Sequence, residues 1–93
     1  MVQKLKNNAL NELIILSTCR EWSSANDIID SYIDMEVEKA SNGTLYPKID
    51  LLVSQNFLKK EKRDFVLQFK TTNLGLKQYN KLKNQLQRVC NYV

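Results

Sequence analysis

The chain begins with two segments whose apolar side chains recur every three or four residues. This spacing predicts a well-buried helix over 8–20. A second helix is expected to begin near Ser24, where Ser-Ser-Ala-Asn-Asp supplies a cap and an acidic first turn. Its apolar stripe comprises Ile28, Ile29, Tyr32 and Ile33. Residues 35–39 then alternate apolar and polar, which predicts a short strand.

A third helix is expected after the start signal at 41–44, with Leu45, Ile49, Leu52 and Val53 on one face. Pro47 lies in its first turn if Gly43 or Thr44 is the cap, but costs one helical hydrogen bond if Ser41 is the cap. Asn56 is expected to end this helix in a left-handed conformation, which asparagine tolerates.

Two strands are predicted next, over 57–61 and 64–70, with the charged segment 61–64 as the hairpin link. In the second strand, Phe65, Leu67 and Phe69 share one face, and Val66, Gln68 and Lys70 share the other. This alternation predicts a hairpin with one apolar face.

A long final helix follows a cap at Thr71-Thr72-Asn73. Apolar residues recur along this helix at spacings of three and four over two heptads, and they form a seam on one face. The seam comprises Tyr79, Leu82, Leu86, Val89 and Val93. The helix either packs on its own domain or pairs with a second copy. Because it extends about 20 residues past a small core, we expect it to form a homodimer interface, with Cys90 beside the seam.

The predicted element order is helix, helix, short strand, helix, strand, charged turn, strand and long helix. This is the order of a winged helix-turn-helix, an α+β fold. We therefore expect a single domain over 1–93, with its core at about 8–72 and a C-terminal dimerisation helix at about 73–93. In this architecture the third helix enters the DNA major groove, and the hairpin wing touches the backbone or the minor groove.

Composition excludes most enzyme chemistry. The chain has 93 residues, no histidine, two cysteines and two glycines. A structural zinc site is not expected, because the two cysteines lie 71 residues apart, and a glycine-rich phosphate loop cannot be written with two glycines. We expect no catalytic residues, metal or cofactor, although a site made of Asp, Glu, Lys and Tyr stays open. The longest apolar run is four residues, so no membrane span or signal-peptide core is expected, and the location is taken as cytoplasmic.

The charge is divided unevenly along the chain. Residues 1–40 carry four basic and seven acidic side chains, whereas residues 41–93 carry ten basic and three acidic ones. A basic half on a small protein fits a polyanion partner, here double-stranded DNA. The alternative is a solvated basic surface.

Three motifs stand out along the second half of the chain: Gly43-Thr44-Leu45-Tyr46-Pro47, Phe57-Leu58-Lys59-Lys60-Glu61 and Phe69-Lys70-Thr71-Thr72-Asn73-Leu74-Gly75. Together they resemble the motifs of the PadR family of winged-helix transcriptional regulators. The resemblance covers about residues 8–93 and implies a DNA-binding regulator. The compact size and the abundance of Lys, Asn and Ile are also similar to small winged-helix proteins of viruses infecting thermoacidophilic archaea. A viral origin would place the protein in the host cytoplasm.

Candidate DNA contacts fall on two elements, the start of the third helix and the wing. Short polar side chains and cations at these places can contact base edges and phosphates. On the helix they are Ser41, Asn42, Thr44, Tyr46 and Lys48, and on the wing they are Lys60, Lys62 and Arg63. Ser41 and Thr44 are also candidate caps, Tyr46 a candidate packing residue, and the wing cations candidate protectors of a strand edge. Trp22, at a helix corner, is expected in the core.

The two cysteines have different expected roles. Cys90 is a candidate for an intersubunit disulfide, or else a free thiol near the interface. Cys19 is expected to be a small buried apolar residue, with a Cys19–Cys90 pair left open. The sequence as a whole predicts a homodimeric, sequence-specific DNA-binding regulator. The alternative is a winged-helix protein-interaction module that uses its acidic half.

Overall fold

The computed structural model describes residues 2–37 and 41–92, with side chains described over 9–37 and 41–88. The expected α+β architecture is confirmed. The elements in chain order are α1 (Val2–Thr18), β1 (Ser23–Ser24), α2 (Ala25–Asp34), α3 (Asn42–Ser54), β2 (Leu58–Arg63), β3 (Val66–Thr71) and α4 (Asn73–Tyr92).

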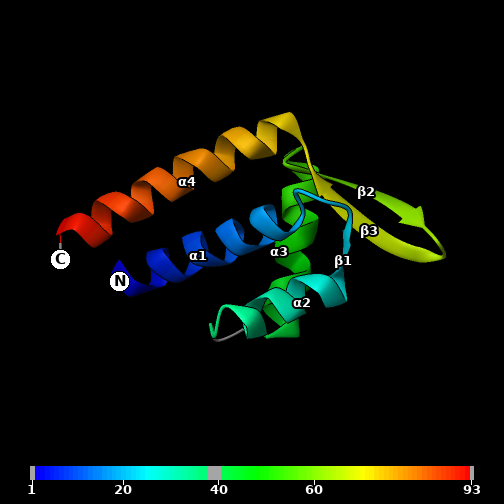
Figure 1. The fold of residues 1–93 in the computed structure, drawn as a ribbon, viewed down its shortest axis with the longest axis horizontal. Helices are drawn as coiled ribbons and strands as arrows, with labels where there is room; N and C mark the ends of the chain where they lie inside the picture. Colours follow the sequence, from blue (N-terminus) through cyan, green and yellow to red (C-terminus); the bar gives the residue numbers. More distant parts are fainter. Residues whose placement is uncertain (1, 38–40, 93) are drawn as a thin grey trace.

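The strands form an antiparallel sheet in the order β1-β3-β2. The β2–β3 hairpin projects from one end of the molecule, and α1 and α4 carry the two termini toward the other (Figure 1). The molecule is elongated as a result, with extents of 45 × 26 × 21 Å. The hairpin is the wing of a winged helix.

The core lies where α1, α2, α3 and the base of the sheet meet. α1 is central, because three consecutive residues, Ile14, Ile15 and Leu16, are all buried and so face neighbours on several sides. The remaining buried apolar residues come from every other helix and from both hairpin strands: Cys19, Ile28, Tyr32, Leu45, Ile49, Leu52, Leu58, Phe69 and Leu82.

The starts of α2 and α3 follow the sequence signals closely. Ser24 caps α2 in a full capping box, in which its side chain accepts from the Asp27 N–H and the Asp27 carboxylate accepts from the Ser24 N–H. Ser41 is the N-cap residue of α3, so Pro47 lies inside the helix rather than in its first turn. One helical hydrogen bond is therefore lost at Pro47, which is the outcome expected for a helix beginning at Ser41.

Asn56 has a φ of 64°, as expected for the residue that ends α3. Beside Asn56, the end of α3 and the start of α4 lie in close contact. Thr72 Oγ1 donates to the Asn56 carbonyl at 2.5 Å and accepts from the Gly75 N–H at 3.0 Å. A Cβ on Gly75 would lie 2.1 Å from the Phe57 carbonyl oxygen. The end of α3 is thus fixed against the start of α4.

The strand expected over 35–39 is wrong in the described part of that segment. Met35 is the C-cap of α2 and Glu36 has a φ of 55°, so the chain turns there. Residues 38–40 lie outside the described residues. The first strand is instead Ser23–Ser24, paired with Phe69 and Gln68. A two-residue strand of serines has no alternation for sequence reasoning to detect.

The wing turn and one helix position also differ from expectation. The turn is Asp64-Phe65, flanked by the pair Arg63–Val66, rather than the charged segment 61–64. Phe65 is therefore a turn residue and is 95% exposed. Ile33, expected on the buried stripe of α2, is 69% exposed, because Ile28 and Tyr32 define the buried face and Ile33 lies to its side.

α1 starts at Val2 instead of near residue 8, so it runs beside α4 for much of its length. Its far end is tied to the sheet, where the buried Thr71 donates from Oγ1 to the Leu16 carbonyl at 2.8 Å and from N–H to the Cys19 carbonyl at 2.6 Å. α1 thereby connects the long C-terminal helix with the base of the wing.

Candidate nucleic-acid interface

The start of α3 is open to solvent. Ser41, Asn42, Thr44 and Tyr46 are all exposed, so four of the five contacts expected on this helix lie at the surface. Ser41 makes no side-chain cap hydrogen bond to the backbone, and its hydroxyl donates to Thr44 Oγ1 at 3.2 Å. Capping therefore does not occupy these hydroxyls, and they remain at the surface of the helix start.

The outward face of α3 continues with residues that sequence reasoning did not single out. Pro47, Asp50 and Leu51 are exposed on it, at the helical spacing that also places Gly43 and Tyr46 there. Among the described side chains of this face there is no cation. Sequence spacing from Tyr46 could have found this set, since the buried positions Leu45, Ile49 and Leu52 fix the opposite face.

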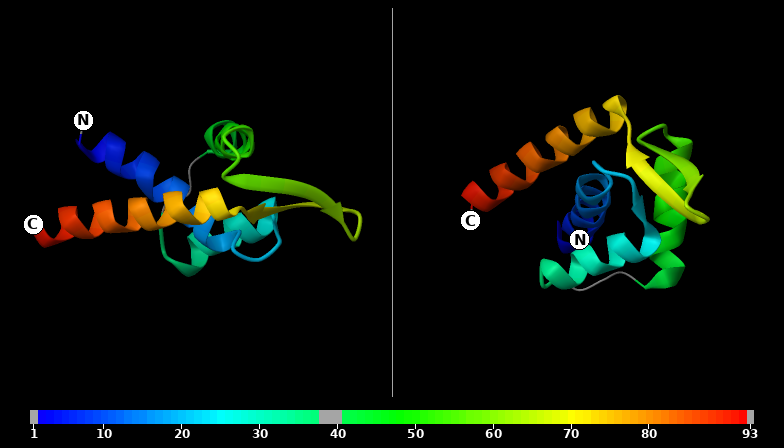
Figure 2. Two further views of the ribbon diagram at one scale, coloured as in Figure 1. Left: turned by 90° about the horizontal axis from the view of Figure 1, so that it is seen from above. Right: turned by 45° about the vertical axis from the view of Figure 1, so that its right-hand side comes forward.

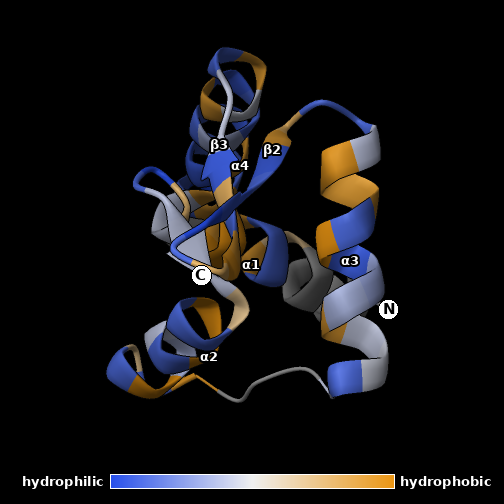
Figure 3. Ribbon diagram, turned by 90° about the vertical axis from the view of Figure 1, so that its right-hand side faces the viewer, coloured by the Kyte–Doolittle hydropathy of each residue, from blue (hydrophilic) through white to orange (hydrophobic). Residues whose placement is uncertain are grey.

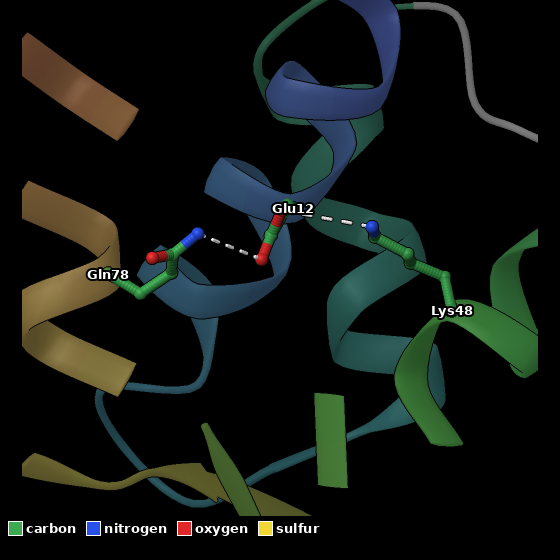
Figure 4. Close-up of polar contacts among 3 residues, drawn as sticks. All are labelled: Glu12, Lys48 and Gln78. Carbon is green, nitrogen blue, oxygen red and sulfur yellow. Dashed lines mark hydrogen bonds and ion pairs between the residues drawn. The ribbon is translucent and has the colours of Figure 1, made fainter. Parts of the chain in front are cut away.

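Lys48 does not share that outward face. Its ammonium lies 3.7 Å from Glu12 Oε2 on α1, and the two side chains are only 25% and 14% exposed (Figure 4). The other Glu12 oxygen accepts a hydrogen bond from Gln78 Nε2 on α4 at 3.4 Å. Glu12 thus links α3 and α4 through α1, and the expected DNA contact by Lys48 requires it to leave this ion pair.

The wing divides its cations between two faces. Lys60 and Lys62 follow the buried Leu58 at two-residue spacing, so all three side chains share one face of β2. The two lysines continue this core-side face beyond the edge of the core. Both are exposed, and neither forms an ion pair within residues 9–37 and 41–88. Figure 3 shows β2 as a largely hydrophilic strand. These two lysines are the wing cations best placed for phosphate contact.

Arg63 lies on the opposite face and is engaged within the protein. Its guanidinium carbon is 4.7 Å from the centre of the Trp22 ring, and its Nη1 is 3.7 Å from Glu61 Oε1. Lys59 Nζ approaches the same ring at 5.6 Å. Trp22, expected in the core, is half-buried beneath these two cations, and it supports the wing through cation–π contacts.

The expected dimer seam is partly used inside the chain. Leu82 is buried in the core cluster, and Tyr79 and Leu86 are half-buried. Arg20, after α1, lies over the Tyr79 ring at 5.7 Å. The side chains of Val89 and Cys90, and Val93 entirely, lie outside the described residues. The interface and the Cys90 disulfide therefore stay predictions.

The other chemistry of the described residues is sparse. Cys19 is buried as expected, and its burial, with a smaller effect from the Asp27 carboxylate, raises the pKa of the thiol to about 12. No cluster of three metal-ligating side chains occurs among the residues described. None of the helices there is long and apolar enough to cross a bilayer.

Comparison of the fold with solved structures finds PadR-type regulators. A PadR-family transcriptional regulator from Eggerthella lenta superposes with a TM-score of 0.78 at 23% identity, covering 97% of this chain and 80% of that one. A PadR-like transcription factor from Bacteroides fragilis gives 0.78 at 21% identity, covering 98% and 93%. SSV1 F-93 gives 0.66 at 18% identity, covering 88% and 87%.

At these identities the comparisons show the fold. It is the winged helix of the PadR regulators, and it is shared with SSV1 F-93, so both resemblances noted in the sequence are confirmed. No family model and no curated protein sequence matches the chain. What the site does must therefore be argued from its own residues.

Proposed function

We propose that this protein is a sequence-specific, double-stranded-DNA-binding transcriptional regulator that acts as a homodimer. The observation that carries the proposal is the position of Lys60 and Lys62, two exposed wing cations without an acidic partner among the described residues. They lie on β2, and the right-hand view of Figure 2 shows the hairpin and α3 together on the side of the molecule away from the two termini. A basic wing beside an exposed helix is what a duplex needs for phosphate and groove contacts.

In this proposal the wing and the start of α3 make different contributions to DNA binding. Lys60 and Lys62 supply salt-dependent affinity, because each neutralised phosphate releases counterions. Asn42, Thr44 and Tyr46 supply base and phosphate contacts from the exposed start of α3. With no cation on the outward face of α3 in the described part, affinity depends on the wing and discrimination depends on the helix.

Dimerisation extends the site. Pairing through the distal part of α4, around Leu86 and Val89, would set two copies of α3 in successive major grooves, about 34 Å apart on a pseudo-palindromic site. The resemblance to proteins named as PadR regulators supports this regulatory role, and nothing in the proposal involves catalysis.

The test is fluorescence anisotropy on duplexes from the protein's own promoter region, at salt from about 50 to about 300 mM. We expect the double variant Lys60→Ala/Lys62→Ala to bind more weakly and to reduce the slope of log affinity against log salt by about 4, because each of the two copies in the proposed homodimer loses two phosphate contacts. The matched control is Lys81→Ala/Lys83→Ala, which removes the same charge from exposed positions of α4. An equal effect in both variants, or no duplex binding at low salt, contradicts the proposal.

One observation favours a second candidate, a protein-interaction module. The C-terminal end of α2 exposes Ile33 and Met35 next to Asp30, Asp34 and Glu36, an apolar patch with an acidic surround. Charge reversal at Asp30 and Asp34 distinguishes the candidates. It leaves duplex affinity unchanged under the DNA proposal, and it abolishes function in the cell under the module hypothesis.

A further inference from the structure

We propose that the tip of the wing is an apolar wedge, and that Phe65 inserts between base steps from the minor groove of duplex DNA. This inference rests on the proposed function and deepens it, because it assigns a DNA-deforming residue beyond the phosphate-contacting lysines. It is carried by the conformation and surroundings of Phe65, and by the charge of the hairpin that presents it.

Phe65 contributes almost nothing to the fold of the isolated chain. Its side chain is 95% exposed, so its apolar surface is in water. Its φ is 65° and that of Asp64 is 51°, so both turn residues are left-handed. Two-residue hairpin turns of this kind favour Asn-Gly or Asp-Gly, and a bulky aromatic there is an outlier. The residue is thus unfavourable in its backbone conformation, and its apolar side chain stays in water unless a partner covers it.

Phe65 is the end of a short apolar edge and does not stand alone. Val66 and Leu67, which follow it on β3, are each about half exposed. In the hairpin register Val66 lies opposite Arg63, and Leu67 lies opposite Lys62. A shallow surface hollow lined by Lys62, Asp64 and Phe65 lies at the turn. The tip therefore has an apolar strand and a cationic strand side by side.

This pairing fits the minor groove. Proteins that bend DNA from the minor groove insert apolar side chains, phenylalanine among them, between base steps while neighbouring cations contact phosphates. The hairpin from 58 to 71 carries five cations and two acids, so the apolar tip is delivered by a positively charged arm. A lipid surface or a second copy of the chain would also cover an apolar tip, and both enter the test as competing outcomes.

The geometry of the arm supports insertion. The hairpin is the most extended part of the sheet, and its turn lies at the far end of the molecule from the termini (Figure 2). A two-residue turn is the narrowest way to end a hairpin, so only Asp64 and Phe65 have to enter the groove. Trp22, under Lys59 and Arg63, holds the arm against the domain.

The experiment uses the full chain and promoter duplexes in which 2-aminopurine replaces single adenines, together with end-labelled duplexes that report bending by energy transfer. The variants are Phe65→Ala and Phe65→Leu, with Leu74→Ala as the matched control, an exposed apolar residue on α4. We expect Phe65→Ala to bind about 5- to 100-fold more weakly and to lose both the 2-aminopurine signal of an unstacked step and the bend. Phe65→Leu retains both signals, and Leu74→Ala matches the unaltered protein.

The failures are distinguishable. If Phe65→Ala binds duplex with unchanged affinity, 2-aminopurine signal and bend, the wedge is refuted while the DNA-binding function stands. If the unaltered protein binds no duplex, the proposed function fails and the wedge fails with it. If Phe65→Ala instead loses binding to anionic phosphatidylglycerol vesicles, or changes the oligomeric state with unchanged 2-aminopurine signal, the occupant is a membrane or a second copy and the wedge is refuted. Thermal unfolding confirms that each variant is folded.

Discussion

Lys48 Nζ on α3 lies 3.7 Å from Glu12 Oε2 on α1, in a half-buried position between the helices. Gln78 on α4 donates to the other Glu12 oxygen, so one carboxylate holds three helices together. Since α3 carries the exposed polar residues and α4 carries the expected dimer seam, this carboxylate contacts both of the helices that the proposed regulator uses.

The first prediction separates a structural Lys48 from a DNA-contacting one. We expect Lys48→Met to lower the free energy of unfolding by about 1–2 kcal/mol, because it leaves the Glu12 carboxylate half-buried without its partner. The duplex affinity of the folded protein stays within about twofold, and its salt slope does not change. Chemical denaturation and anisotropy measure the two effects.

The matched comparison for this prediction is Lys60→Met, made on the exposed wing. It should reduce the salt slope by about 2, one phosphate contact for each copy of the proposed homodimer, and leave the free energy of unfolding unchanged within about 0.5 kcal/mol. A reduced salt slope in Lys48→Met would show that Lys48 leaves Glu12 to contact phosphate, as the sequence interpretation had it.

The second prediction concerns the two glycines. Alanine at Gly75 would place its Cβ 2.1 Å from the Phe57 carbonyl oxygen, whereas at Gly43 the nearest atom is Ser41 Oγ at 3.9 Å. We expect Gly75→Ala to destabilise the protein by about 2 kcal/mol or more, because the start of α4 has to move away from the end of α3. Gly43→Ala should be neutral or stabilise by up to about 1 kcal/mol through helix propensity. Equal midpoints of denaturation in the two variants would contradict this.

The third prediction addresses strain in the wing turn. Phe65→Gly should raise the free energy of unfolding by about 1 kcal/mol, since glycine adopts a positive φ without steric cost and removes an exposed aromatic. The same change should weaken duplex binding, so stability and function move in opposite directions. Thermal melts beside anisotropy show this, and a destabilised Phe65→Gly would mean that the aromatic packs in the free protein.

The fourth prediction is a loss of stability at alkaline pH. Burial raises the pKa of Cys19 from 9.0 to about 12, and burial likewise raises the pKa of Tyr32 to about 12. Between these values the unfolded chain has released protons that the folded chain retains, so stability is complete below pH 9.0 and falls as pH rises toward about 12. We expect Cys19→Ala to give a shallower fall of melting temperature with pH. Parallel curves for the two proteins would contradict the assignment to Cys19.

Particular residues show how far sequence reasoning reaches. The caps at Ser24 and Asn56 were identified because capping is local chemistry between a residue and its near neighbours. β1 was missed because Ser23 and Ser24 form a strand only through backbone pairing with β3, which lies far away in the sequence. The strand expected at 35–39 is wrong over its described residues, 35–37, for the complementary reason: no strand pairs with them there, and the chain turns at Met35 and Glu36.

The candidate site divides in the same way. The exposure of Ser41, Asn42, Thr44 and Tyr46 follows from helix periodicity, and the wing lysines follow from strand alternation. The inward position of Lys48 does not, because it depends on where α1 brings Glu12. The same holds for Arg63, whose guanidinium is held by a tryptophan about forty residues earlier in the chain.

The sequence by itself determined the order of the four helices and the hairpin, the winged-helix class, the basic second half and the residue types at the helix start and the wing. These depend on periodicity, capping and charge, which act over a few residues. Only the tertiary structure decided which cations point to solvent, where the hairpin turns, and that Phe65 stands exposed at the tip. Those features depend on contacts between residues far apart in the chain, and their energies are settled only when the helices and strands pack together.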